Sequence, residues 1–421
     1  MEQHVSTSTK LAAACAGTLE HDPDAAASAL IEGVTPAIQP GEADLCVLFV
    51  SGRHVTHLAE LADALKYRLA PGTIIGVSAE GVVASHHEYE QRTGASVFVA
   101  SMPNTSLVPF TYRELPHVND GDDAALEVMG KIMGVEDDAR GVLFFADPFS
   151  VPTGSTLDAF ARLPGPNVPA MGGLASASPA PGGNALLLND QVSHSGGIGV
   201  TIRGDIAVDA LVSQGCKPIG PTMVVTKAQR NIITGLAGRD AVSVLEEMVS
   251  ELDPDDRELL SNGLFVGRVI DERKPRFGRG DFLIRGILGV DQANNAIAVG
   301  DLVRTGQTVQ FHARDARTAH DDLGLLLAGL SMRGPYAGGM LFTCNGRGRR
   351  LFGHTNADVT TIRRAFGDLD GALNASEQSG ALPISGFFAA GEIGPIGDGV
   401  FVHGQTACLG IFRPRSGATT R

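Results

Sequence analysis

The apolar residues of this chain fall mainly into short continuous runs separated by amphipathic stretches. Residues 45–50, LCVLFV, form an apolar run with the length of a buried strand. Residues 54–70 place leucines on one helical face, and Pro71 and Gly72 end that predicted helix. A second strand is predicted over residues 73–78. The order of strand, helix and strand is typical of an α/β fold.

The same order returns further along the chain. VLFF at residues 142–145 lies 95 residues after VLFV at 47–50, and GGLASA at 172–177 lies 96 residues after GVSAEG at 76–81. A third, weaker copy begins with MLFT and ends in GFFAAGE at residues 386–392. This period is much longer than that of solenoid repeats. The sequence therefore predicts a duplicated α/β unit of domain size.

These patterns predict a mixed α+β fold, in which strand-helix-strand units form mixed sheets covered by helices in two linked domains. The segment before the first strand is alanine-rich and is expected to be helical, since Asp22 and Pro23 suit the start of a helix. A boundary is expected near residue 235, where a strand-rich region gives way to an amphipathic helix. The predicted divisions are a helical N-terminal arm (1–41), a first domain (42–235), a second domain (236–413) and a disordered tail (414–421).

The composition argues against nucleic acid and membranes as partners. The net charge of −14 argues against nucleic acid, which requires a basic surface. No run approaches the roughly 20 apolar residues of a membrane span, so we expect a protein without membrane insertion. The five cysteines are scattered and include no Cys-x-x-Cys pair, which favours a reducing, cytoplasmic setting over a disulfide framework or a zinc ribbon.

Polar side chains gather around the glycine-rich turn that ends the third copy. Glu392 follows Gly391 in this turn, and His403, Gln405 and Thr406 stand at the entry to the next apolar strand. A carboxylate in such apolar surroundings is unfavourable unless it is paired or hydrogen-bonded. Glu392 is therefore either the receptor for a ligand ammonium or a structural carboxylate that accepts backbone N–H groups.

A second turn, CNGRG, supplies the complementary charge. Arg347 could grip a ligand carboxylate with its guanidinium fork and complete an amino-acid clamp with Glu392. The alternative is that Arg347 belongs to a solvated basic cluster with Arg349 and Arg350. Asn345 could donate to a ligand, although a role in the turn itself is the simpler interpretation.

Two other groups of residues could suit catalysis or metal binding. Cys344 and His403 would suit acyl transfer or hydrolysis if they met in the fold, because an adjacent imidazole can generate a thiolate. The run His86-His87-Glu88 together with Glu90 could suggest a metal, but adjacent histidines alternate faces on a strand, and an exposed loop is expected instead. No metal site and no cofactor are predicted.

Several of these motifs occur together in one known family. CNGRG, the following Phe352-Gly353 pair, GFFAAGEIGPI and HGQTA resemble the C-terminal half of FIST proteins, and GVSAEG resembles a turn in the N-terminal half. The resemblance covers residues 42–413, so the two predicted domains would be FIST N-like and FIST C-like. The first-copy turn departs from the last, because Gly81 is followed by Val82 rather than by a glutamate.

The resemblance implies a sensory module that binds a small polar ligand, with amino acids as the suspected class, and that acts on a signalling protein. Ligand sensing is therefore the leading hypothesis, with Glu392, Arg347, Asn345, His403, Gln405, Thr406 and Gly391 as the candidate ligand-binding residues. A Cys344/His403 enzyme and a protein-interaction scaffold are the alternatives.

Overall fold

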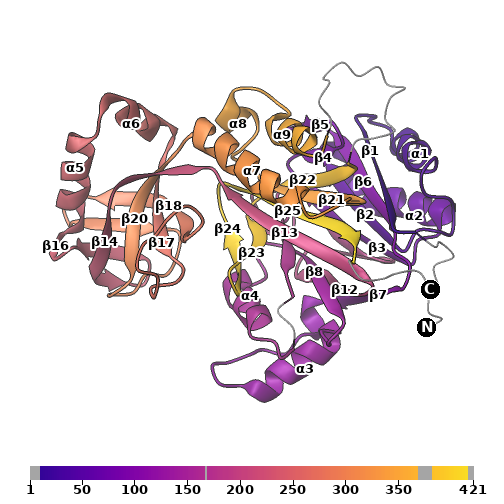
Figure 1. Ribbon diagram of the computed structural model, residues 1–421, viewed down its shortest axis with the longest axis horizontal. Coiled ribbons are helices and arrows are strands. Elements are labelled where there is room, and N and C mark those ends of the chain that lie inside the picture. The colour runs from indigo at the N-terminus through magenta and orange to yellow at the C-terminus, as the bar shows by residue number, and fades with distance from the viewer. Residues whose placement is uncertain (1–9, 166–167, 368–381, 416–421) are drawn as a thin grey trace. The chain divides into compact units, whose positions relative to one another are not determined.

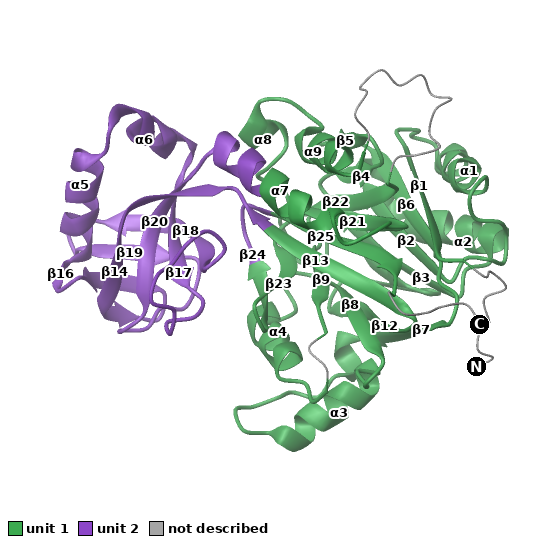
Figure 2. Cartoon of the chain, in the orientation of Figure 1, with its two compact units in different colours: residues 1–212, 323–402, 407–421 green, residues 213–322, 403–406 purple. Residues whose placement is uncertain are grey.

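The computed structural model describes residues 10–165, 168–367 and 382–415. It contains two compact units, each of which draws on separate parts of the sequence (Figure 2). As predicted, the fold is mixed α+β. The larger unit comprises residues 1–212, 323–402 and 407–421, and the second, which we call the barrel unit, comprises residues 213–322 and 403–406.

The larger unit is built on three six-stranded sheets that share one plan (Figure 1). Each sheet has a central parallel pair, flanked on one side by two antiparallel strands and on the other by a hairpin. The first sheet has the order β1 (Ala12–Thr18), β6 (Gly94–Ser101), β2 (Leu45–Ser51), β3 (Thr73–Ala79), β10 (Leu186–Leu188) and β11 (Gln191–Ser193). The second has the order β7 (Thr105–Thr111), β12 (Gly197–Gly204), β8 (Ala139–Ala146), β9 (Ala170–Leu174), β23 (Glu392–Ile396) and β24 (Gly399–His403). The third has the order β13 (Ile206–Gln214), β25 (Thr406–Pro414), β21 (Gly338–Cys344), β22 (Ile384–Ala389), β4 (Val82–Ala84) and β5 (His87–Tyr89).

The hairpins are exchanged cyclically among the three copies. Hairpin β4–β5 follows β3 in the chain but pairs with β22, hairpin β10–β11 follows β9 but pairs with β3, and hairpin β23–β24 follows β22 but pairs with β9. The register makes the first hairpin residues equivalent, since Val82 faces Phe387, Leu186 faces Val77 and Glu392 faces Gly173. The predicted repeat is therefore threefold in the structure, and Glu392 occupies a position that is aliphatic in the other two copies.

Three backbone hydrogen bonds at corresponding positions link the copies to one another. Each joins the second strand of one copy to the residue that precedes an incoming hairpin. The bonds run from Ser78 N to Ala185 O (2.9 Å), from Leu174 N to Gly391 O (2.8 Å) and from Phe388 N to Gly81 O (3.0 Å).

A shared glycine in the second strand of each copy has a steric cause. Gly76, Gly172 and Gly386 face Leu48, Phe144 and Leu341 in the parallel pairs. A Cβ at Gly386 would lie 1.8 Å from the Leu341 carbonyl oxygen, and one at Gly172 would lie 2.0 Å from that of Phe144. Glycine is therefore required for close approach of the backbones at Gly172 and Gly386. The register also places Leu48 and Phe144 in equivalent positions, so the strand offset is 96 residues, one more than the sequence motifs indicated.

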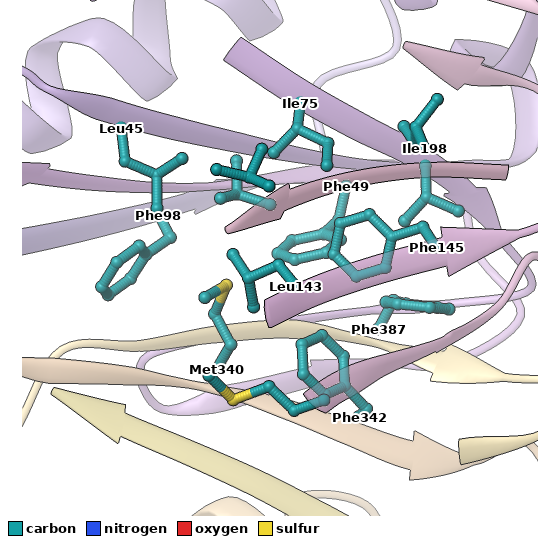
Figure 3. Close-up of a cluster of buried hydrophobic side chains, with 14 of the residues drawn as sticks. Leu45, Phe49, Ile75, Phe98, Leu143, Phe145, Ile198, Met340, Phe342 and Phe387 are labelled. Carbon is teal, nitrogen blue, oxygen red and sulfur yellow. The ribbon is translucent and has the colours of Figure 1, made fainter. Parts of the chain in front are cut away.

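The three sheets pack on a common aromatic core (Figure 3). Phe49, Phe145 and Phe342 come from the first strand of each copy, and Phe387 joins them from β22; all four are fully buried. The ring centroids of Phe49 and Phe145 are 5.9 Å apart, and those of Phe145 and Phe342 are 5.7 Å apart. Burying one such side chain contributes about 1.5–3 kcal/mol, so this core is a main source of stability for the larger unit.

The N-terminal segment is only partly helical, which corrects the prediction of a helical arm over residues 1–41. Helix α1 (Pro23–Val34) is present, with Asp22 as its N-cap, but Ala12–Thr18 is the edge strand β1. The small residues of β1 allow close packing, since a Cβ at Gly33 would lie 2.5 Å from the Cβ of Ala16. Pairing with β6 thus overrides the helical propensity of alanine. Of the tail predicted to be disordered, Pro414 ends β25, and residues 416–421 lie outside the described residues.

The helices of the larger unit cover the outer faces of its sheets or connect strands. No helix in the described ranges is long and apolar enough to cross a membrane. Besides α1, the helices of the larger unit are α2 (Leu58–Leu69), α3 (Asp123–Met133), α4 (Thr153–Ala161), α8 (Arg349–Phe352) and α9 (Ala357–Ala365). Helix α7 (Ala316–Ser331) contains residues of both units.

The barrel unit is a small antiparallel barrel with its own core. Six strands close on themselves because β14 pairs with both β20 and β15, and β16 extends β15. The strand order is β14 (Cys216–Gln229), β20 (Thr308–Arg314), β17 (Leu264–Val269), β18 (Phe282–Asp291), β19 (Ala296–Val299), β15 (Ile232–Leu236) and β16 (Arg239–Asp240), and the helices are α5 (Ala241–Glu251) and α6 (Pro254–Leu259). Short 3-10 turns occur at Gly52–His57, Tyr112–Glu114 and Leu260–Asn262.

Candidate functional site

The candidate site begins where the parallel strands β21 and β22 end side by side. Cys344 faces Ala389 as the last pair of this ladder. The CNGRG turn then reverses the chain: Asn345 N donates to the Ala389 carbonyl (3.0 Å), and Arg347 N donates to that of Cys344 (2.8 Å). The carboxyl ends of parallel strands are where α/β sheets commonly bind ligands. The turn therefore presents Arg347 at a favourable edge of the third sheet.

Arg347 is fully buried in an ion pair with Asp358, the second residue of α9. Its Nε and Nη2 atoms donate to the two oxygens of Asp358 at 2.9 and 2.7 Å. Asp358 also accepts from the hydroxyl of Thr343 (2.8 Å), and the ring of Phe352 lies 5.3 Å from the guanidinium. The two-point grip predicted for a ligand carboxylate is thus made with the protein's own Asp358. The buried Nη1 atom makes no hydrogen bond to the described residues.

Glu392 is also fully buried and starts strand β23. Burial is the largest single effect and lowers the pKa of Arg347. The charge of Asp358 and its hydrogen bond, together with the charges of Cys344 and Glu392, raise this pKa by more in sum, so the net shift is upward. Glu392 thus lies within electrostatic range of Arg347. The preceding Gly391 is tightly packed, since a Cβ there would lie 2.8 Å from the Val402 side chain. The structure therefore brings Asn345, Arg347, Gly391 and Glu392 together.

The other predicted residues lie at the turn between β24 and β25, which groups with the barrel unit. His403 and Thr406 are 2% and 1% exposed. Gln405 has a left-handed backbone (φ 63°), and its carbonyl accepts from Gly215 N at 2.9 Å. Cys344 belongs to the larger unit, where its thiol accepts from Gly346 N at 3.4 Å. Catalysis by Cys344 and His403 stays a prediction.

Sequence reasoning missed the buried carboxylates around Arg347. The prediction of an exposed loop at His86-His87-Glu88 is wrong for Glu88, which is 4% exposed, although His87 is exposed. Glu88 accepts from Val359 N (3.0 Å), and its own N–H donates to the Asn356 side chain (2.7 Å), so it caps α9. The alternation of faces along β5 was the available signal. Among the described residues, no group of three or more His, Cys, Asp or Glu side chains is placed to hold a metal ion.

The raised pKa of the buried Glu88 carboxyl group predicts a pH dependence of stability. Burial, together with the negative charges of Asp358 and Glu90, raises its pKa from 4.5 to about 8. Because this pKa is higher in the folded than in the unfolded state, the contribution of Glu88 to stability is greatest below pH 4.5 and falls as the pH rises toward 8, by at most about 1.4 kcal/mol per pH unit. Glu88→Gln should flatten this part of the curve in urea unfolding at a series of pH values. Glu32→Gln, at an exposed position on α1, should keep the wild-type slope. Equal slopes for Glu88→Gln and wild type would refute the assignment.

Comparison with protein families assigns both parts of the chain. Residues 44–239 match the FIST N domain, and residues 241–395 match the FIST C domain. The chain belongs to the FIST family. Two proteins similar to this chain are Uncharacterized protein Rv0628c of Mycobacterium tuberculosis (strain H37Rv) and Uncharacterized protein Mb0898c of Mycobacterium bovis. Both are 38% identical to this chain. The alignment with Rv0628c covers 91% of this chain and 92% of the relative, and the alignment with Mb0898c covers 88% of this chain and 91% of the relative.

The candidate site draws on both matched regions. Arg347, Asp358 and Glu392 lie within the FIST C match, whereas Glu88 reaches α9 from the FIST N match through the exchanged hairpin. His403 lies beyond the end of the FIST C match at residue 395. The exchange of hairpins thus makes the surroundings of Asp358 depend on both parts of the FIST chain.

Proposed function

We propose that this protein is a sensory module that binds a small polar ligand at the ends of β21 and β22 and passes the binding event to a signalling protein. FIST domains are regarded as small-ligand sensory domains of signalling proteins, which supports this class of function. The observation that carries the proposal is the burial of Glu392 at a position filled by Val82 and Leu186 in the other two copies. The shared architecture therefore does not require a carboxylate there.

The charges favour a ligand with an ammonium group. Two carboxylates, Asp358 and Glu392, act on one guanidinium, that of Arg347. Asp358 already occupies two donors of Arg347. A ligand ammonium would therefore interact with the carboxylate of Glu392, because a charged donor forms its strongest hydrogen bonds with a carboxylate. An amino acid fits this arrangement if its carboxylate takes Nη1 of Arg347 or a polar group of the CNGRG turn.

Binding at this site requires movement, because Glu392 and Arg347 have no exposed surface. The half-buried Asn345 and Gly346 form the outer side of the turn. The turn is tied to the first copy, since Arg350 binds both the Asn345 carbonyl (2.8 Å) and the carboxylate of Glu80 (2.7 Å). Opening of the turn would therefore change contacts on the surface, which is the kind of change that a partner protein can detect.

A ligand screen with one variant tests the proposal. Wild-type protein is titrated in thermal-shift assays with L-amino acids, with amines that lack the carboxylate and with acids that lack the ammonium group. A bound ligand at about 100 times its Kd adds about 2.7 kcal/mol of stability. We expect shifts with amino acids and amines and none with the simple acids.

Glu392→Leu separates a ligand-binding role from a structural one. The variant restores the aliphatic residue of the equivalent copies and removes a buried charge, so its stability without ligand should not fall, while the ligand shift disappears. Glu32→Gln, on the surface of α1, should leave both quantities at wild-type values. A flat screen for wild type, or a ligand shift that survives in Glu392→Leu, contradicts the proposal.

A further inference from the structure

The barrel unit contains a pair of arginines on neighbouring strands. Arg268 of β17 faces Leu283 of β18, and Arg285 of β18 faces Val266 of β17. Residues that face each other across an antiparallel pair share a face of the sheet. Val266 and Leu283 are buried at 2% and 1% exposure, so the two arginines extend the buried face. Their side chains keep 24% and 17% of their surface exposed and can therefore be reached from solvent.

The two guanidinium groups share a single carboxylate. Asp301 Oδ2 accepts from Arg285 Nε at 3.0 Å and from Arg268 Nη2 at 3.4 Å. The second oxygen of Asp301 accepts from its neighbour Leu302 N at 2.8 Å. One negative charge thus stands against two positive ones, and both arginines use the same oxygen.

Donor capacity remains after these contacts. Arg268 Nε is buried and makes no hydrogen bond within the described part of the chain. Arg285 uses Nη1 for the carbonyl of Ile284 at 3.1 Å, which leaves its Nη2. Burial lowers the pKa of Arg285, and the positive charge of Arg268 lowers it further, whereas Asp301 opposes both. The two guanidinium groups therefore repel each other in partly buried surroundings, and an additional negative charge between them would offset that repulsion.

We propose that Arg268 and Arg285 form a binding site for a small oxyanion, either a phosphate or a carboxylate. Both classes offer two or more acceptor oxygens to guanidinium donors, which is the geometry that arginine recognises best. Asp301 holds the two side chains together in the unliganded protein and competes with the anion for them. The site lies in the barrel unit and does not depend on the function proposed for the larger unit.

Because Asp301 competes with the anion, its replacement should change the anion affinity in the opposite direction to replacement of the arginines. Isothermal titration of the full chain at low ionic strength, with inorganic phosphate in one arm and acetate in the other, identifies the class of anion. Arg268→Gln and Arg285→Gln should each weaken binding about tenfold or more, while Asp301→Asn should strengthen it about tenfold. Arg273→Gln is the matched control, because Arg273 is 90% exposed in the same unit.

Each result decides for or against the site. Binding that follows this pattern supports it. No binding of either anion, or equal weakening by Arg273→Gln, overturns it, since the latter would indicate a general effect of surface charge. If the Arg268 and Arg285 variants fail to fold, Asp301→Asn decides alone: tighter binding supports the site, and unchanged or weaker binding overturns it.

Discussion

Replacement of Asp358 by alanine should lower the free energy of unfolding by about 3–5 kcal/mol. The variant would leave the fully buried guanidinium of Arg347 without its paired carboxylate, and the hydroxyl of Thr343 would lose its acceptor. A buried charge without a partner is among the largest destabilising effects of a single substitution. Urea unfolding followed by circular dichroism measures the change.

Two controls separate the loss of pairing from the loss of a negative charge. Asp63→Ala removes an exposed carboxylate that lies 3.9 Å from Lys66, and it should change stability by less than about 1 kcal/mol. The double replacement Arg347→Met with Asp358→Leu removes both charges and should recover most of the stability lost in Asp358→Ala. If Asp358→Ala were as mild as Asp63→Ala, Arg347 could not depend on this pair.

Gly386→Ala should destabilise the larger unit by about 3 kcal/mol or more, above the usual range for overpacking. The added Cβ would lie 1.8 Å from the Leu341 carbonyl oxygen, and no change of rotamer can relieve a contact with backbone. The strands β21 and β22 would have to separate at the centre of the third sheet. The melting temperature and the yield of soluble protein both report this effect.

The equivalent glycine of the first copy provides the matched comparison. A Cβ at Gly76 would lie 3.0 Å from the Leu48 carbonyl oxygen, so a shift of a few tenths of an ångström can accommodate Gly76→Ala. We expect a clearly smaller loss of stability than for Gly386→Ala. Equal losses would show that glycine serves backbone flexibility at these positions rather than close approach.

Local patterns in the sequence were sufficient for elements whose burial is set by their own neighbours. The apolar run at residues 45–50 predicted β2, and the leucine periodicity before Pro71 predicted α2, because both depend on periods of two or 3.6 residues. The third copy could also be recognised, since the close approach of β22 to β21 requires glycine at position 386. For β1, pairing across the sheet outweighed the local preference of alanine, and the prediction failed.

The candidate site was only half predictable. The polar turns at Arg347 and Glu392 follow buried strands, and this order along the chain was enough to place them together. The partner of Arg347 could not be inferred, because an aspartate at the start of a helix is equally suited to the helix dipole. Alternation along β5 indicates only that Glu88 and His87 lie on opposite faces. The pairing of hairpin β4–β5 with β22, which places Glu88 beside α9, leaves no trace in that alternation.

The cyclic exchange of hairpins also has a consequence for biosynthesis. Hairpin β4–β5 is made early, but Val82 pairs with Phe387, so roughly 300 further residues must be synthesised before its partner strand exists. The first sheet likewise cannot be completed until β10, which belongs to the second copy, has been synthesised and can pair with β3. Contacts this distant in sequence slow folding, because loop closure precedes the pairing that stabilises it. The nascent chain therefore exposes unpaired strand edges for most of its translation, and ribosome-associated chaperones are the factors expected to protect them.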